Sequence, residues 1–218
     1  MDYFELFETM KLENGRILFF EEHLERLKNS CDYFLFRFDE KRIRKKLNKI
    51  SESNSRGFFR LKFQLGKSGD FSTEITKYPY LPSEIKIILS ENRIDQQNKY
   101  QYFKTTNRNL YEEELQAYSS EGFFEVIYLN KNEELAEGSF TNIFIRKRDL
   151  WYTPPLFAGV LPGIFRNEFI KKTDGVKEIP LHINDLYEAD EILLTNSLRG
   201  EIKVDAVYFD EQEFKTFD

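Results

Sequence analysis

The sequence has one cysteine, two histidines and no long uncharged run, and each shortage excludes a class of protein. Its single cysteine, Cys31, forms no internal disulfide, which fits a reducing compartment. Its two histidines, His23 and His182, lie far apart without ligand-like spacing, so we expect no metal site. No uncharged stretch approaches the roughly 18 to 20 residues of a membrane helix. The acidic start also lacks the basic residues of a signal peptide, and we expect a cytoplasmic protein that binds no membrane.

Acidic residues outnumber basic ones, 38 to 32. The formal net charge of −6 argues against a general nucleic-acid binder, which needs a basic face to offset phosphate repulsion. Neither Gly66–Gly69 nor Gly159–Gly163 has the spacing of a P-loop or a dinucleotide fingerprint. No nucleophile-elbow motif supports a Ser-His-Asp triad. Phenylalanine, in contrast, is abundant at 22 residues, which predicts dense, ring-rich cores.

The first part of the chain is typical of a small α/β domain. Leu24, Leu27 and Cys31 form an apolar stripe on a predicted helix, and Asp39 is a plausible N-cap for a second helix up to Ile50. The predicted strands are Phe4–Leu12, Ile17–Phe20, Gly57–Leu65 and Phe71–Lys77, with the turn Asn14-Gly15 joining the first two. Two prolines stiffen Tyr78–Pro82, so we place a boundary there, between domains 1–79 and 80–218.

The second part also alternates strands and helices. The predicted strands are Glu84–Leu89, Phe123–Leu129, Phe140–Arg146 and Ile192–Thr195, and the predicted helices are Leu110–Tyr118 and Gly163–Lys172. Pro162 is expected at the first position of the latter helix, where a missing N–H is tolerated. The whole pattern predicts an α/β protein of the α+β type, with antiparallel hairpins in both domains.

Two charged residues have unusual neighbours. Lys104 lies among aromatic and hydroxyl residues in Tyr102–Arg108, where partial desolvation would lower its pKa and favour a nucleophilic amine. Glu137 lies among small residues directly before an apolar strand. Taken singly, a surface lysine and an exposed turn glutamate are the commoner cases.

Two glycine-containing segments are candidate phosphate sites. Gly159–Arg166 opens a helix, and the N–H groups and dipole of a helix start favour a phosphate. Leu194–Gly200 is a buried strand that ends in hydroxyls and a glycine turn. Many helices start like the first segment and bind nothing, and ordinary capping explains the second equally well.

In their order along the chain, these segments resemble the fold type IV enzymes that depend on pyridoxal 5′-phosphate (PLP), the class IV aminotransferase family. Glu137 follows Lys104 by 33 positions, close to the separation in that family. The matching segments are His23–Leu27, Glu137–Ser139 with Thr141-Asn142, and Leu161–Ile164 with Arg166. The resemblance implies a two-domain fold, with a small N-terminal α/β domain and a larger C-terminal β-barrel-like α/β domain that binds PLP.

The same resemblance implies a role for each candidate residue. Lys104 would bind PLP covalently and act as general acid and base, and Glu137 would face the pyridine nitrogen. The phosphate would be held by Arg26, by the backbone of Gly163, Ile164 and Phe165, and by the Ser197 hydroxyl. Arg108 or Asn107 would approach the phenolic oxygen. Phe165 stands where aminotransferases of the family often carry threonine.

Within the family, three segments are similar to the aminodeoxychorismate lyase subgroup: Leu6–Met10, Lys104–Arg108 and Asn196–Gly200. This implies a homodimer that converts a small-molecule substrate, 4-amino-4-deoxychorismate, into 4-aminobenzoate and pyruvate for folate biosynthesis. An aminotransferase of D-amino acids or branched-chain amino acids is the main alternative, and a non-catalytic binding protein on the same fold is another. The candidates for binding substrate carboxylates are Arg60, Arg93, Arg108 and Arg199.

Overall fold

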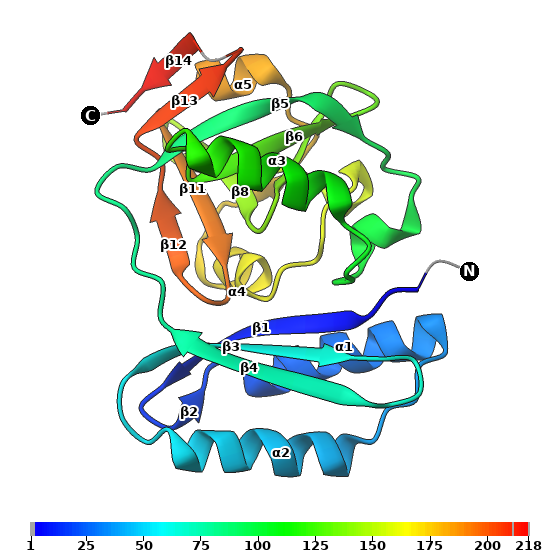
Figure 1. Cartoon of the computed structure of the whole chain (residues 1–218). Helices are drawn as coiled ribbons and strands as arrows, with labels where there is room; N and C mark the ends of the chain where they lie inside the picture. The colour runs from blue at the N-terminus through cyan, green and yellow to red at the C-terminus, as the bar shows by residue number, and fades with distance from the viewer. Residues whose placement is uncertain (1–2, 211, 218) are drawn as a thin grey trace. The chain divides into compact units, whose positions relative to one another are not determined.

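The computed structural model describes residues 3–210 and 212–217. The chain folds into two compact units, which are drawn together in Figure 1. The first unit consists of the chain up to Tyr80 together with Phe103–Asn107, and the second of Leu81–Tyr102 with the chain from Arg108 onward. In the described part of the chain, no helix has the length and apolar character needed to cross a membrane.

The first unit is an antiparallel sheet of order β2-β1-β3-β4 with two helices on one face (Figure 1). Its elements are β1 (Leu6–Glu13), β2 (Arg16–Ile17), α1 (Phe20–Phe34), α2 (Glu40–Ser53), β3 (Phe58–Leu65) and β4 (Phe71–Lys77). Every second residue of β1 points to the helices, as the period of a strand requires. Leu6 and Met10 therefore share one core with Leu27 of α1, Leu47 of α2 and Leu61 of β3.

Local sequence signals set the boundaries of these elements. The Asp39 side chain accepts the Arg42 N–H at 3.0 Å and caps α2, as predicted. Asn14 and Gly15 both have positive φ, which a tight hairpin turn requires. The returning strand is shorter than predicted and ends at Ile17, because Phe19 adopts a left-handed conformation and α1 begins directly after it.

The segment Phe103–Asn107 completes the edge of β1 that β2 leaves uncovered. β2 pairs only with the end of β1, at Leu12 and Glu13. Near the start of β1, the Phe7 N–H donates to the Lys104 carbonyl at 3.0 Å and the Thr106 N–H donates to the Glu5 carbonyl at 2.9 Å. Our sequence-based division put Lys104 in the larger domain, but these backbone hydrogen bonds group it with the first unit.

The second unit contains two five-stranded sheets, of order β14-β13-β5-β6-β7 and β10-β9-β8-β11-β12. Its elements are β5 (Lys86–Ile94), η1 (Lys99–Tyr102), α3 (Asn109–Ser120), β6 (Glu125–Asn130), β7 (Leu135–Gly138), β8 (Asn142–Lys147), β9 (Leu150–Thr153), η2 (Leu156–Ala158), α4 (Ile164–Lys172), β10 (Lys177–Glu178), α5 (Ile183–Tyr187), β11 (Glu191–Asn196), β12 (Gly200–Lys203), β13 (Ala206–Phe209) and β14 (Gln212–Thr216). Ile87 and Ile127 of the first sheet and Ile143 and Ile192 of the second belong to one buried cluster, so the sheets share a core.

Three features of the second unit differ from the prediction. β5 pairs with β6 and with β13 in parallel, so the sheets are mixed and not simple hairpins. α3 lies between β5 and β6 in the chain and supplies the crossover that a parallel pair needs. The short strands β7, β9, β10, β12, β13 and β14 and the short helix α5 were not predicted. α4 begins at Ile164 with Gly163 as its extended N-cap, so Pro162 precedes the cap and is not the first helical residue.

Candidate functional site

Lys104 reaches an aromatic side chain of β1. The Lys104 side chain is half-buried, and its Nζ lies 4.6 Å from the centroid of the Phe7 ring. Lys62 of β3 approaches the same ring at 5.4 Å. The aromatic neighbour of the amine is therefore distant in sequence. The adjacent Phe103 ring packs instead on Tyr33, with the centroids 4.4 Å apart.

Arg26, on α1, is held by a buried carboxylate that our sequence analysis did not select. Glu8 is 2% exposed and accepts the Arg26 Nε–H on Oε1 at 2.8 Å and the Nη2–H on Oε2 at 2.5 Å. His23, on the same helix, is 1% exposed, and its Nδ1 lies 2.6 Å from Glu8 Oε2. A charged residue at a core-facing position of β1, between Leu6 and Met10, is the signal that could have identified Glu8.

Burial and neighbouring charges set the protonation states of Glu8 and His23 at neutral pH. Burial raises the pKa of Glu8, but the charges and hydrogen bonds of Arg26 and His23 outweigh it and lower that pKa to about 2. Burial also lowers the pKa of His23, although Glu8 acts in the opposite direction. Near pH 7, Glu8 is therefore ionised and His23 neutral. The Nε2 of His23 has no hydrogen-bond partner among the described residues.

In the second unit, Glu137 is a buried acceptor near the end of β7. The Leu161 N–H donates to Glu137 Oε2 at 2.8 Å, and the Tyr111 hydroxyl donates to Oε1 at 3.4 Å. The amide of Asn142 also donates to Oε2, at 3.5 Å. Burial and the charge of Glu137 raise the pKa of Tyr111 well above its usual value, so this hydroxyl keeps the proton that it donates.

A second buried carboxylate, Glu125 of β6, shapes the turn that follows β7. Glu125 is fully buried and accepts the N–H groups of Ser139 at 2.9 Å and Phe140 at 3.1 Å. The hydroxyls of Ser139 and Thr141 donate to the same carboxylate. A Cβ on Gly138 would overlap both Glu125 and Thr141, so only glycine fits there. The sequence pattern of this turn was recognised, but Glu125 was not.

Gly163, Ile164 and Phe165 lie at the start of α4, close to Asn142. A Cβ on Gly163 would overlap Asn142 Oδ1, so the chain can make this close approach only with glycine. The Asn142 amide donates to the Leu161 carbonyl at 3.0 Å and thereby ties β8 to the loop before α4. Ile164 and Phe165 are the first helical residues, whose N–H groups point away from the helix body, where an anion would bind.

Ser197 lies in the turn between β11 and β12, beside the start of α4. The Asn196 side chain accepts the backbone N–H groups of the two residues that follow Ser197. Gly200 closes the turn against Phe165, since a Cβ on this glycine would lie 3.4 Å from the Phe165 ring. The Thr195 hydroxyl is buried and has no hydrogen-bond partner among the described residues. The structure thus brings the turn and the helix start together.

The predicted arginines have different environments. Arg108, the N-cap residue of α3, donates to the Ser139 carbonyl and lies over the Tyr111 ring at 5.3 Å. Arg108 is therefore adjacent to side chains that surround Glu137. Arg60 of β3 forms a long ion pair, 4.0 Å, with Glu74.

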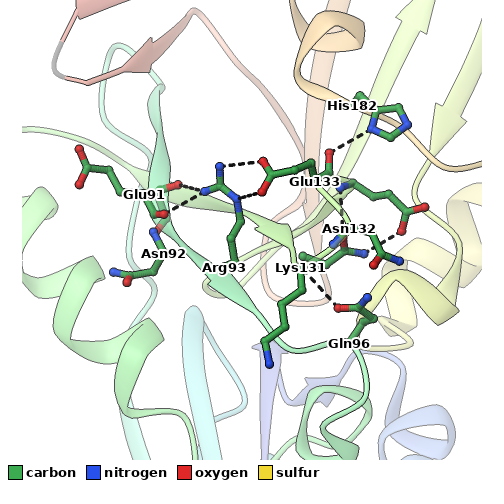
Figure 2. A network of polar contacts seen from close by, with 11 residues as sticks. Glu91, Asn92, Arg93, Gln96, Lys131, Asn132, Glu133 and His182 are labelled. Carbon is green, nitrogen blue, oxygen red and sulfur yellow. Dashed lines mark hydrogen bonds and ion pairs between the residues drawn. The ribbon is translucent and has the colours of Figure 1, made fainter.

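Arg93 forms an ion pair with Glu133, in the hairpin that follows β6, as Figure 2 shows. Its Nε and Nη2 each donate to a different Glu133 carboxylate oxygen at 2.9 Å, and its Nη1 donates to the carbonyls of Ser90 and Glu91. His182 contacts the Glu133 carbonyl through Nδ1 at 3.0 Å. Because these contacts use both edges of the guanidinium, we set Arg93 aside as a candidate for binding substrate carboxylates.

Comparison with known protein families and sequences gives matches along the chain. The profile of the family described as amino-transferase class IV matches residues 5–207. A Schizosaccharomyces pombe protein described as "putative aminodeoxychorismate lyase" is 24% identical over 93% of this chain and 90% of its own length. A Thermotoga maritima protein described as "probable branched-chain-amino-acid aminotransferase" is 38% identical, but over only 37% of this chain and 31% of its own length.

Solved structures match over nearly the whole chain. The "putative amino-acid aminotransferase" of Mesorhizobium loti has a TM-score of 0.85 and 31% identity, covering 94% of this chain and 99% of that one. The "putative 4-amino-4-deoxychorismate lyase" of Legionella pneumophila has a TM-score of 0.85 over 98% of this chain and 86% of that one. The latter identity is 23%, so this similarity concerns the fold alone.

Proposed function

This chain belongs to the class IV aminotransferase family, whose members use PLP, and we propose that it is a lyase that converts 4-amino-4-deoxychorismate into 4-aminobenzoate and pyruvate. Among the sequence relatives, the observation that supports this reaction is the extent of alignment. The Schizosaccharomyces pombe lyase relative aligns over nearly all of both chains, whereas the Thermotoga maritima aminotransferase aligns over a minor part of each.

The side chains present fit PLP chemically. An aldehyde is held by an amine, a phosphate dianion by a guanidinium and a helix start, and a protonated pyridine nitrogen by a carboxylate. We assign Lys104 to the aldehyde, Glu137 to the ring nitrogen, Arg108 to the phenolic oxygen, and Arg26, Gly163, Ile164, Phe165 and Ser197 to the phosphate. The unpartnered hydroxyl of Thr195, next to that turn, supports a polar ligand in the same place.

Glu137 tunes the cofactor, and its own neighbours hold it in place. When bound, PLP supplies an electron-accepting ring that stabilises negative charge on the carbon next to the substrate amine. The negative charge of Glu137 favours the protonated form of the ring nitrogen. The hydrogen bonds from Leu161 and Tyr111 fix the orientation of this carboxylate in the absence of solvent.

Lys104 moves the proton of the reaction. Its Nζ removes the proton from the amine-bearing carbon of the substrate. The ether C–O bond then breaks and its electron pair leaves with the enolate of pyruvate, which takes up one proton at carbon and so balances the proton that Lys104 removed. The remaining six-membered ring becomes aromatic, which makes the step strongly downhill. This role requires that Lys104 be unprotonated near the working pH.

The direct test supplies 4-amino-4-deoxychorismate without any amino acceptor. We expect 4-aminobenzoate and pyruvate in equal amounts, and no product with Lys104→Ala. Lys67→Ala, at an exposed position in the turn before β4, serves as the control and keeps the activity. Wild-type protein that binds PLP and yet forms no 4-aminobenzoate would overturn the proposed reaction.

A branched-chain or D-amino-acid aminotransferase is the second candidate. The 31% identity with the Mesorhizobium loti protein over nearly the whole chain favours it. A transaminase needs two substrates, so the assay combines an amino donor with 2-oxoglutarate and measures the new keto acid. Keto-acid formation that stops when 2-oxoglutarate is omitted would favour this candidate over the lyase.

We also propose that the protein works as a homodimer and binds PLP as a holoenzyme. Light scattering should give twice the chain mass of 26.2 kDa. A fully active species of 26.2 kDa would contradict the dimer. Purified protein should have the absorbance band of lysine-bound PLP, which Lys104→Ala removes. Absence of that band after addition of PLP would favour a non-catalytic binding protein.

A further inference from the structure

We propose that Glu8 and His23 are positioning residues that hold the Arg26 guanidinium for the phosphate group of PLP. This inference rests on the role proposed above for Arg26 and deepens it. It assigns a task to a buried carboxylate and a buried imidazole that have no other part in the proposed reaction.

The first step of the argument is the geometry of the ion pair. Glu8 occupies the edge of the guanidinium formed by Nε and Nη2, with contacts of 2.8 and 2.5 Å. A guanidinium is planar, so two hydrogen bonds along one edge fix its plane and direct the Nη1 N–H groups away from the carboxylate. An unrestrained arginine side chain would lose rotamer entropy on being fixed. Glu8 orders the Arg26 side chain before the phosphate binds.

The second step is the fixation of Glu8 itself. Its Oε2 accepts from Arg26 and also contacts Nδ1 of His23 at 2.6 Å. A neutral imidazole that donates from Nδ1 leaves Nε2 without a proton, which agrees with an Nε2 that has no partner among the described residues. His23 therefore adds a hydrogen bond to Glu8 without adding a positive charge next to Arg26.

The third step is the connection to Lys104. The Phe7 N–H, one residue before Glu8, donates to the Lys104 carbonyl. β1 therefore fixes the backbone of Lys104 directly and the guanidinium of Arg26 through Glu8. The Lys104 backbone and the Glu8 side chain that orients Arg26 therefore depend on adjacent residues of one strand.

A buried ionic cluster could also serve only to stabilise the fold, and the test must separate the two roles. Pyridoxal lacks the phosphate but keeps the aldehyde and the ring. A loss of general stability weakens binding of PLP and of pyridoxal alike. A loss of phosphate positioning weakens binding of PLP alone.

The experiment measures dissociation constants of PLP and pyridoxal for the cofactor-free full chain by absorbance titration. Glu8→Asp keeps the negative charge that pairs with the Arg26 guanidinium but shortens the reach to it. We expect PLP affinity to fall by about tenfold or more, the scale of one charge-assisted hydrogen bond, with pyridoxal affinity nearly unchanged. Glu8→Gln and His23→Asn should act in the same direction. Glu21→Gln, on α1 like Arg26, removes the charge of the exposed two-contact ion pair with Arg44 of α2 and should change neither constant.

Two results would overturn the inference: wild-type PLP affinity in both Glu8 variants, or equal losses for PLP and pyridoxal. Failure of the proposed function has a different signature. If the wild-type chain binds no PLP, or if Arg26→Gln leaves the PLP affinity unchanged, the proposed cofactor site itself is wrong.

Discussion

At the scale of single residues, each of three buried carboxylates is surrounded by hydrogen-bond donors. Glu8, Glu125 and Glu137 accept from side chains or backbone N–H groups that face them from other elements. Burying a charge without partners is strongly unfavourable, so such residues persist only where donors replace water. Removal of one carboxylate therefore also leaves its donors without an acceptor. We expect such substitutions to lower the stability of the fold strongly.

Glu125→Gln should destabilise the fold. The substitution replaces an acceptor oxygen with an NH₂ group that faces the donors of Ser139, Phe140 and Thr141. We expect the free energy of unfolding to decrease by about 2 to 4 kcal/mol, measured by urea denaturation. Glu121→Gln, at an exposed position after α3, is the matched control and should have little effect. Equal stability of both variants would contradict the role given to Glu125.

Acid should destabilise the protein through Glu8 and His23. The pKa of Glu8 lies below its ordinary 4.5, so its contribution is complete above that pH and is lost as the pH falls from 4.5 toward about 2. The pKa of His23 lies below 6.5, so the unfolded chain takes up this proton first as the pH falls below 6.5. The charged groups that act on His23 are Glu8, Arg26 and Lys104. Urea denaturation at several pH values should show that His23→Asn loses the upper part of this dependence.

At the scale of elements, sequence signals predicted most helices and strands but not how they pair. The Asp39 cap, the Asn14-Gly15 turn and the apolar stripe of α1 act within a few residues, so the sequence alone specifies them. β7 is too short to carry a periodic pattern, and the parallel pairing of β5 and β6 depends on a crossover helix between them.

The residues of the candidate site also fall into a group that the sequence indicates and a group that only the fold reveals. Lys104 and Glu137 were predicted through the order of motifs, which is a property of the sequence, and their roles stay predictions. Glu8 and Glu125 were missed because their partners lie far along the chain, for example Arg26 for Glu8. Only folding makes these carboxylates into acceptors for Arg26 and for the turn after β7. The fold type IV architecture itself was predicted through the resemblance and is confirmed by the structural matches.

Gly163→Ala should disturb the start of α4. The new Cβ would overlap Asn142 Oδ1, and moving the amide would break its hydrogen bond with the Leu161 carbonyl. We expect a loss of about 1 to 3 kcal/mol in the free energy of unfolding. Asn142→Ala in the same chain removes the overlapping atom. The double variant should therefore be more stable than the sum of the two single effects, and strict additivity would contradict the proposed overlap.

At the scale of the whole molecule, the chain passes between its two units three times. It leaves the first unit after Tyr80, returns for Phe103–Asn107 and leaves again at Arg108. The exposed connection at Tyr80, whose side chain is 82% accessible, is the expected site of proteolytic nicking. The segment that carries Lys104 lies beyond this connection in the chain, but its backbone is hydrogen-bonded at the start of β1 in the first unit.

Limited chymotrypsin digestion should therefore cut at Tyr80 without separating the pieces. The downstream fragment still contributes Phe103–Asn107 to β1 through backbone hydrogen bonds. We expect two bands in a denaturing gel and a single peak in gel filtration. Separate elution of the fragments under native conditions would contradict this arrangement.

The return of the chain to β1 also has a consequence for synthesis on the ribosome. The first unit cannot complete the edge of its sheet when its own eighty or so residues have emerged, since the segment Phe103–Asn107 that completes it is encoded beyond the linker. Until Thr106 leaves the exit tunnel, the start of β1 presents unpaired N–H and C=O groups that other chains can bind. The lysine proposed to hold the cofactor thus arrives together with the segment that ends this vulnerable interval.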